Sequence, residues 1–182
     1  SLVYYYSSSS NPIPESHYIF CLIISIIGIL IRFFAVGFAF YKTSGKNTKK
    51  QIAEKLNTTG AYSIVRNPLY IANYLNWLGV ILLFSNYIIT IITSFFFVII
   101  YYKIVLVEEK FLFKKFKDKY KLYFDRTPRI IPDFTKWIKP EKKFNLLKSL
   151  INIKNGLLAI SIFFFIIGSI ENYKFYDFLF ID

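Results

Sequence analysis

Long apolar runs separated by short polar or basic stretches dominate the chain. Residues 18–41, 69–84, 87–107 and 150–170 are each strongly apolar, and a helix needs about 20 apolar residues to cross a bilayer core. Only the dipeptide 85–86 separates the second run from the third, so these two runs predict a tight antiparallel helical hairpin. The pattern therefore predicts an all-α integral membrane protein with about four transmembrane helices.

Beyond Glu109 the pattern changes from continuously apolar to amphipathic. Large apolar residues recur at helical spacing while lysines fill the positions between them: Leu112, Phe116, Tyr120 and Tyr123. This spacing predicts a cytoplasmic, interfacial amphipathic helix whose aromatic face turns toward lipid or toward the helical bundle. Pro128 should end the helix, because proline disfavours a helical conformation in its own position and in the preceding residue.

The net charge and the rare residue types exclude several classes of function. The formal net charge is +12, but the lysines lie beside apolar segments and no nucleic-acid motif accompanies them, so a membrane is the expected partner rather than a nucleic acid. Cys21 and His17 are the single cysteine and the single histidine. An internal disulfide is impossible, and no metal site is expected.

The distribution of basic residues predicts the orientation in the membrane. Five lysines lie in residues 42–59 and thirteen lysines and arginines in residues 108–149, whereas the 85–86 turn has none. Basic loops remain on the cytoplasmic side, so both long loops should be cytoplasmic and the turn should lie outside. The abundance of Ile, Lys, Asn, Phe and Tyr favours a bacterial source, and hence a bacterial inner (cytoplasmic) membrane. Because the chain starts at Ser1 and has no methionine, we expect residues upstream of it.

Charged residues at the membrane boundary are the first candidates for chemistry. Arg66 precedes the second apolar run, and Glu108 and Glu109 directly follow the third. Charges at such depths usually face protein or water and mark a binding site. Two simpler interpretations stay open, in which Arg66 extends to lipid headgroups and the following lysines neutralise the two acids. The pair Asn67-Pro68 also has a purely structural interpretation, as the N-cap and first residue of a helix.

The order of these residues resembles the carboxy-terminal signature of the isoprenylcysteine carboxyl methyltransferase and phospholipid methyltransferase superfamily. The resemblance covers about residues 32–132 and rests on an ordered set of short elements: Gly60 with Tyr62, Arg66-X-Pro68-X-Tyr70, the hairpin, Glu108-Glu109, Tyr120-X-X-Tyr123, Pro128-Arg129 and Pro132. It implies a bacterial-type membrane methyltransferase that uses S-adenosylmethionine. Residues 1–182 would then form a single membrane-embedded domain, truncated at its N-terminus, with a cofactor-binding core at residues 60–132.

The resemblance also implies which residues line the site. The family element Arg-His-Pro-X-Tyr falls on Arg66 to Tyr70, with Asn67 where the family often has histidine. Three residues are expected to be catalytic: Arg66, Glu108 and Glu109. Eight are expected to bind the cofactor: Tyr62, Arg66, Asn67, Pro68, Tyr70, Asn73, Glu108 and Glu109.

Each polar group has an expected role toward the cofactor. The planar fork of Arg66 suits the methionine carboxylate. One acid would accept hydrogen bonds from the cofactor amino group, while the other would orient the ribose or a neighbouring basic residue. Tyr62 and Tyr70 would meet the adenine or the sulfonium with a ring face or a hydroxyl. Arg32, within the first apolar run, has an open role and should face the bundle or extend to the interface.

The expected function is methyl transfer to a lipid or lipidated acceptor, through a carboxylate, phosphate or amine, at the cytoplasmic membrane face. Two alternatives remain at this point. A sterol-type membrane reductase with a nicotinamide cofactor has a similar layout, but residues 69–73 lack the acid of its motif. A non-catalytic membrane protein would use the charges only to fix topology. The sequence determines neither the acceptor nor the oligomeric state.

Overall fold

The computed structural model describes residues 13–40 and 53–180, with side chains as far as Tyr173. Within these ranges every regular element is a helix: α2 (Glu15–Phe38), α3 (Ala61–Ile64), α4 (Pro68–Leu82), α5 (Tyr87–Arg126), the 3₁₀ helix η1 (Phe134–Lys136) and α6 (Leu146–Phe180). The all-α prediction is confirmed. The end of the first predicted run and four lysines of the first predicted basic loop lie outside the described residues: Tyr41, Lys42, Lys46, Lys49 and Lys50.

Helix α2 packs closely against α4 because small residues let the two backbones approach each other. A Cβ atom on Gly28 would lie 2.5 Å from the backbone nitrogen of Asn76, and one on Gly79 would collide with the side chain of Ser25. Ser25 Oγ donates a 3.0 Å hydrogen bond to the Asn76 carbonyl. Small residues commonly allow such contacts between membrane helices.

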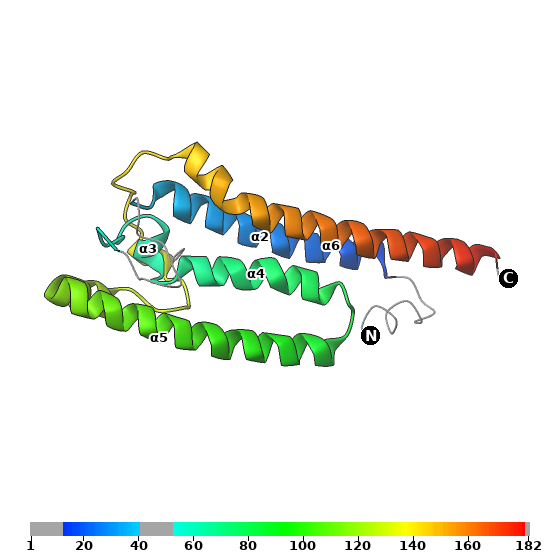
Figure 1. Cartoon of the computed structure of the whole chain (residues 1–182), viewed down its shortest axis with the longest axis horizontal. Coiled ribbons are helices and arrows are strands. Elements are labelled where there is room, and N and C mark those ends of the chain that lie inside the picture. Colours follow the sequence, from blue (N-terminus) through cyan, green and yellow to red (C-terminus); the bar gives the residue numbers. More distant parts are fainter. Residues whose placement is uncertain (1–12, 41–52, 181–182) are drawn as a thin grey trace.

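Helix α6 runs alongside α2 over most of its length (Figure 1). The contact begins at Gly37, where an added Cβ would collide with the ring of Phe144, and it continues through a buried core. That core joins residues of α2, α4 and α6, together with Leu83 beyond α4: Cys21, Ile29, Val80, Leu83, Ile153, Ile160, Phe164 and Ile167. The three helices therefore share one apolar core.

The expected hairpin joins α4 to α5. Ser85 adopts a positive φ of 49° in the turn, and Asn86 Oδ1 then accepts a 3.1 Å hydrogen bond from the backbone nitrogen of Ile89. This bond satisfies one of the free amides at the start of a helix. The two helices therefore run antiparallel directly after the turn (Figure 1).

Among the described residues, three helices are long and apolar enough to cross a membrane: Glu15–Phe38, Tyr87–Arg126 and the Leu146–Tyr173 part of α6. Helix α4 has 15 residues, and at a rise of 1.5 Å per residue it extends only about 22 Å. That is less than the roughly 30 Å of a typical hydrocarbon core. The second of the four predicted spans, residues 69–84, is thus a short apolar helix. It is bounded by Pro68 at its start and by the hairpin turn at its end.

Helix α5 reverses direction at Lys117, whose φ of 43° and ψ of −122° are not helical. The rings of Phe113 and Phe124 lie 5.0 Å apart, although eleven residues of straight helix would separate them by about 16 Å. The expected amphipathic helix is therefore two helical arms. Tyr120 and Tyr123 turn toward the bundle and pack around Leu56. The end of α5 at Arg126, just before Pro128, is as predicted.

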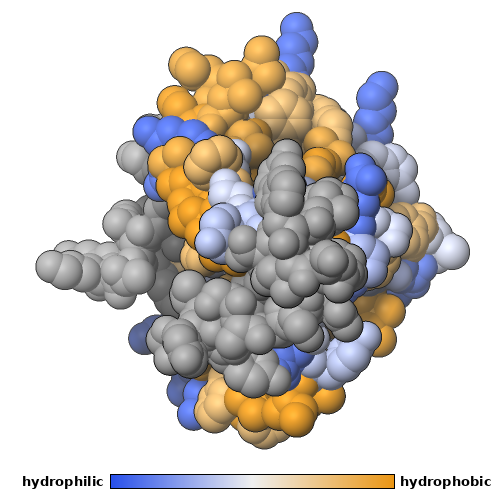
Figure 2. Space-filling view, turned by 90° about the vertical axis from the view of Figure 1, so that its right-hand side faces the viewer, coloured by the Kyte–Doolittle hydropathy of each residue, from blue (hydrophilic) through white to orange (hydrophobic). Residues whose placement is uncertain are grey.

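The outer faces of the helices carry many exposed apolar side chains, including Ile88, Phe95 and Phe165. Figure 2 views the end of the bundle where α2 begins and α6 ends, and it shows apolar side chains at the outer edge. Such a surface is costly in water and natural in lipid. At the opposite end of the molecule, α3, the reversal of α5 and the start of α6 lie together (Figure 1). These are the segments for which the charge pattern predicts a cytoplasmic position.

Candidate functional site

The short segment before α4 is bound to the segment after α5 by backbone hydrogen bonds. The amide of Gly60 donates to the carbonyl of Ile138 at 2.8 Å, and the amide of Arg66 donates to that of Pro128, also at 2.8 Å. Gly60 has a φ of 61°, a conformation that glycine adopts at no steric cost. These bonds bring two parts of the sequence more than sixty residues apart into one corner.

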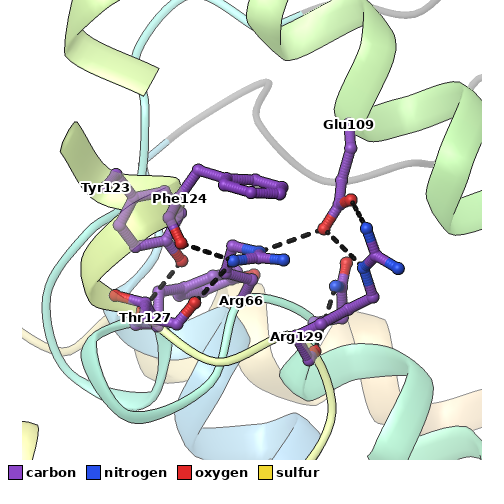
Figure 3. A network of polar contacts seen from close by, with 8 residues as sticks. Arg66, Glu109, Tyr123, Phe124, Thr127 and Arg129 are labelled. Carbon is purple, nitrogen blue, oxygen red and sulfur yellow. Dashed lines mark hydrogen bonds and ion pairs between the residues drawn. The ribbon is translucent and has the colours of Figure 1, made fainter. Parts of the chain in front are cut away.

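Arg66 is almost fully enclosed in this corner. Its Nε donates to Glu109 Oε1 at 3.0 Å, and its Nη1 donates to the carbonyls of Phe124 and Thr127, both at 2.6 Å (Figure 3). The guanidinium carbon lies 3.9 Å from the centroid of the Phe124 ring, within the range of a cation–π contact. Since only 7% of the side chain is exposed, the alternative in which Arg66 extends to lipid headgroups is wrong for this structure.

Glu109 links Arg66 to a second arginine. Arg129 Nη2 lies 2.8 Å from Glu109 Oε2, and Arg129 Nε donates to Oε1 at 3.3 Å. The Glu109 side chain is 6% exposed, and a carboxylate at such burial requires paired charge. The hydrogen bonds that Arg129 donates to Glu109 raise the pKa of Arg129 above its ordinary value, so Arg129 stays charged. We refer to Arg66, Glu109 and Arg129 as the Glu109 network.

Asn67 and Pro68 form part of the same corner. Asn67 occupies the N-cap position of α4 with Pro68 as the first helical residue, but its side chain makes no capping hydrogen bond. Instead, Asn67 Nδ2 donates to the carbonyl of Arg129 at 3.1 Å. Asn67 thus occupies the N-cap position, as the structural interpretation predicts, but its side chain does not cap the helix. The side chain instead binds the backbone of Arg129, a member of the Glu109 network.

Glu108 belongs to a different group of side chains. Tyr70 donates its hydroxyl to Glu108 Oε2 at 2.6 Å, and the Tyr70 ring packs edge-on against Tyr101. Burial raises the pKa of the Tyr62 hydroxyl, with the negative charge of Glu108 as a further cause. Tyr62 is therefore neutral at physiological pH. Glu108 Oε1 accepts no hydrogen bond from the described residues.

Asn73 lies on α4 and contacts the cation in α2. Arg32 Nη1 donates to Asn73 Oδ1 at 2.7 Å, and Arg32 also acts electrostatically on Tyr62. Asn73 therefore lies beside the residues around Glu108. We refer to Arg32, Tyr62, Tyr70, Asn73 and Glu108 as the Glu108 group.

The structure thus divides the predicted residues into two adjacent sets. Arg66, Asn67, Pro68 and Glu109 join the corner, whereas Tyr62, Tyr70, Asn73 and Glu108 belong with Arg32 to the Glu108 group. The residues predicted for the site did not include Arg129, although Pro128-Arg129 is one of the sequence elements that carry the family resemblance. Arg32 was given no role. No feature of the sequence marks the Phe124 and Thr127 carbonyls, because every residue has the same backbone carbonyl whatever its side chain. Among the described residues, no cluster of three His, Cys, Asp or Glu side chains is placed to hold a metal.

Residues 17–119 match the profile of the family described as phospholipid methyltransferase. The chain belongs to this family of S-adenosylmethionine-dependent methyltransferases, which confirms the resemblance read from the sequence. It is similar to the protein-S-isoprenylcysteine O-methyltransferase of Schizosaccharomyces pombe, with 28% identity over 95 residues, which are 49% of this chain and 40% of the relative. The chain therefore spans less than half the length of that curated relative. No solved structure matches it.

Proposed function

We propose that this chain transfers a methyl group from S-adenosylmethionine to a lipid or lipidated acceptor at the cytoplasmic face of the membrane. The family gives the class of reaction. The observation that carries the proposal is that Glu108 and Glu109, adjacent on α5, bond to Tyr70 and Arg66 on either side of the start of α4. Two acids, a buried arginine and a group of tyrosines thus meet at one end of an otherwise apolar bundle.

The two acids have different roles in this proposal. Both oxygens of Glu109 are bonded to arginines, so Glu109 is a positioning residue that holds Arg66 and Arg129. Glu108 has one oxygen bonded to Tyr70 and one without a partner among the described residues. Glu108 is therefore the carboxylate that would accept hydrogen bonds from the amino group of the methyl donor.

Three side chains of the Glu108 group fit the chemistry of this cofactor. A carboxylate suits the ammonium group, and the ring faces of Tyr62 and Tyr70 suit a positively charged sulfur, because aromatic faces attract cations. The cofactor would supply a methyl group on that sulfur, which an acceptor with a free lone pair takes up by in-line displacement. Arg66 and Asn67 shape the wall of the site by holding the chain after α5 against the start of α4.

The described residues favour an acceptor that needs no general base. A carboxylate or phosphate has a free lone pair at neutral pH, whereas an ammonium or thiol must first lose a proton. Glu109 is paired with two arginines, and Tyr62 keeps its proton because burial raises its pKa. The carboxylate of Glu108 is assigned to the ammonium group of the cofactor in this proposal, so it is not available as the base. Alignment and the exclusion of water then supply the acceleration.

The decisive experiment uses purified protein reconstituted in vesicles of bacterial polar lipid. Incubation with methyl-labelled S-adenosylmethionine, followed by separation of lipid from protein, should place the label in the lipid-soluble fraction. The Glu108→Gln variant should lose most of the incorporation, while Lys114→Gln, an exposed change on the same helix, should retain it. Vesicles that bind NADPH but not S-adenosylhomocysteine would instead support the reductase alternative.

A further inference from the structure

Arg32 is a positive charge within the apolar stretch of α2, six residues before the helix ends at Phe38. At 1.5 Å per residue it lies about 9 Å inside that end. A guanidinium at this depth is costly unless it faces protein or a polar partner. Neither the Glu109 network nor the proposed cofactor contacts use this residue.

The packing of α2 on α4 fixes where Arg32 points. Gly28, one helical turn earlier on the same face, touches the α4 backbone at Ala72 and Asn76, and residues four apart on a helix lie above one another. Arg32 therefore faces α4, where Asn73 Oδ1 accepts its hydrogen bond at 2.7 Å. The side chain is held between two helices and is only partly exposed.

The hydrogen-bonding capacity of Arg32 is mostly unused. An arginine offers five N–H donors, and the only hydrogen bond the described residues make to Arg32 is that with the Asn73 amide oxygen. None of the ion pairs between described side chains involves Arg32. Arg32 is thus a fixed, partly buried cation most of whose donors are unused by the described residues.

Arg32 also adjoins the proposed reaction site. Arg32 and Glu108 act with opposite sign on the hydroxyl of Tyr62, and Glu108 is the proposed partner of the methyl donor. An anion beside Arg32 would therefore lie close to the bound methyl donor, on its membrane side.

We propose that Arg32, oriented by Asn73, binds the oxyanion of the lipid acceptor, a phosphate or a carboxylate, between α2 and α4. This inference rests on the proposed function and adds the chemistry of the acceptor to it. A planar guanidinium can bind two oxygens of such a group at once. Its depth in the bundle favours a ligand that enters from the bilayer rather than the water-soluble cofactor.

The test measures binding of three ligand types to full-chain protein in a neutral detergent by thermophoresis. The anionic lipids are dihexanoylphosphatidylglycerol and N-dodecanoylglycine, the neutral control is dihexanoylglycerol, and the cofactor probe is S-adenosylhomocysteine. The variants are Arg32→Gln, Arg32→Lys and the matched control Arg126→Gln, which removes an exposed arginine at the end of α5. Inorganic phosphate tests whether the site takes the anion without a lipid.

In the wild type, at least one anionic lipid should bind more tightly than dihexanoylglycerol and more tightly than inorganic phosphate. Arg32→Gln should weaken that binding about tenfold or more, as expected for the loss of a charged hydrogen bond. Arg32→Lys should weaken it less, and Arg126→Gln should not change it. Binding of S-adenosylhomocysteine should stay within about twofold in every variant.

Three results would overturn the inference. Arg32→Gln could weaken S-adenosylhomocysteine instead of the lipid, which would assign the cation to the cofactor carboxylate. The anionic lipids and S-adenosylhomocysteine could bind the Arg32 variants as they bind the wild type, which would leave Arg32 only a role in packing. Neither anionic lipid could bind the wild type at all. If Arg32→Gln does not fold, Arg32→Lys with a wild-type melting temperature provides the same comparison. Failure of the proposed function differs from all of these, because the wild type would then not bind S-adenosylhomocysteine.

Discussion

Arg66 Nε lies 3.0 Å from Glu109 Oε1, although the two residues are 43 positions apart in the chain. The pair joins the start of α4 to the far part of α5, and Arg129 completes it from the segment beyond. Because the carboxylate and the Arg66 guanidinium are both nearly inaccessible, the contact supports the fold of the site.

The first prediction concerns Arg66→Lys. A lysine keeps the charge, but its single ammonium group lacks the planar fork of arginine. It therefore cannot bind Glu109 and the Phe124 and Thr127 carbonyls at the same time. Loss of charged hydrogen bonds should cost about 1.5–3 kcal/mol, measured as a lower free energy of unfolding in a denaturant titration. Binding of S-adenosylhomocysteine should weaken as a consequence. A variant with wild-type stability and affinity would contradict the structural role of this side chain.

The second prediction contrasts the neighbouring acids. Glu109→Gln leaves two arginines without their counter-charge, and breaking a buried ion pair in this way costs roughly 3–5 kcal/mol. Glu108→Gln should leave the thermal melting temperature close to that of the wild type, yet weaken S-adenosylhomocysteine about tenfold. Melting curves and calorimetry on both variants provide the comparison, and the reverse pattern would exchange the roles proposed for the two residues.

The third prediction uses Tyr70→Phe. The change removes the hydroxyl that donates to Glu108 and keeps the ring that packs against Tyr101. The affinity for S-adenosylhomocysteine should fall by less than in Glu108→Gln, because a positioning bond is lost while the carboxylate remains. Tyr101→Phe is the matched control, since none of the described hydrogen bonds uses its hydroxyl. An equal loss in both variants would indicate a general effect on packing.

The fourth prediction concerns the reversal of α5. Lys117 has a φ of 43° and a ψ of −122°, a conformation that a residue with a Cβ rarely adopts and glycine adopts readily. Lys117→Gly should therefore stabilise the protein by about 1 kcal/mol, whereas Lys115→Gly, within a helical arm, should destabilise it by a similar amount. Denaturant titration of the two variants measures the difference. Destabilisation by both would show that α5 continues straight through this position.

The fifth prediction tests orientation. Asn86 caps α5, so the neighbouring exposed residue is the better reporter, and Ser85→Cys in a Cys21→Ser background should react with an impermeant thiol reagent added outside cells. Lys143→Cys, exposed at the opposite end of the bundle, should react only after the membrane is opened. The expectation rests on the positive charge of the long loops. Labelling of Lys143→Cys in intact cells would invert the topology.

The sequence by itself determined the membrane class, the hairpin and the residue types of the site. Runs of apolar residues specify helices in lipid because every backbone polar group must be satisfied within the helix. The order from Arg66 to Glu109 also pointed to the family whose profile residues 17–119 match.

Only the tertiary structure decided which residue bonds to which. Glu108 and Glu109 are neighbours in the sequence, but successive residues on a helix point about 100° apart, so one meets Tyr70 and the other Arg66. The sequence does not predict the reversal at Lys117, because the residue with positive φ there is not a glycine. This reversal brings the Phe124 and Thr127 carbonyls to Arg66. Backbone acceptors carry no signature of residue type, so their contribution follows from the path of the chain alone.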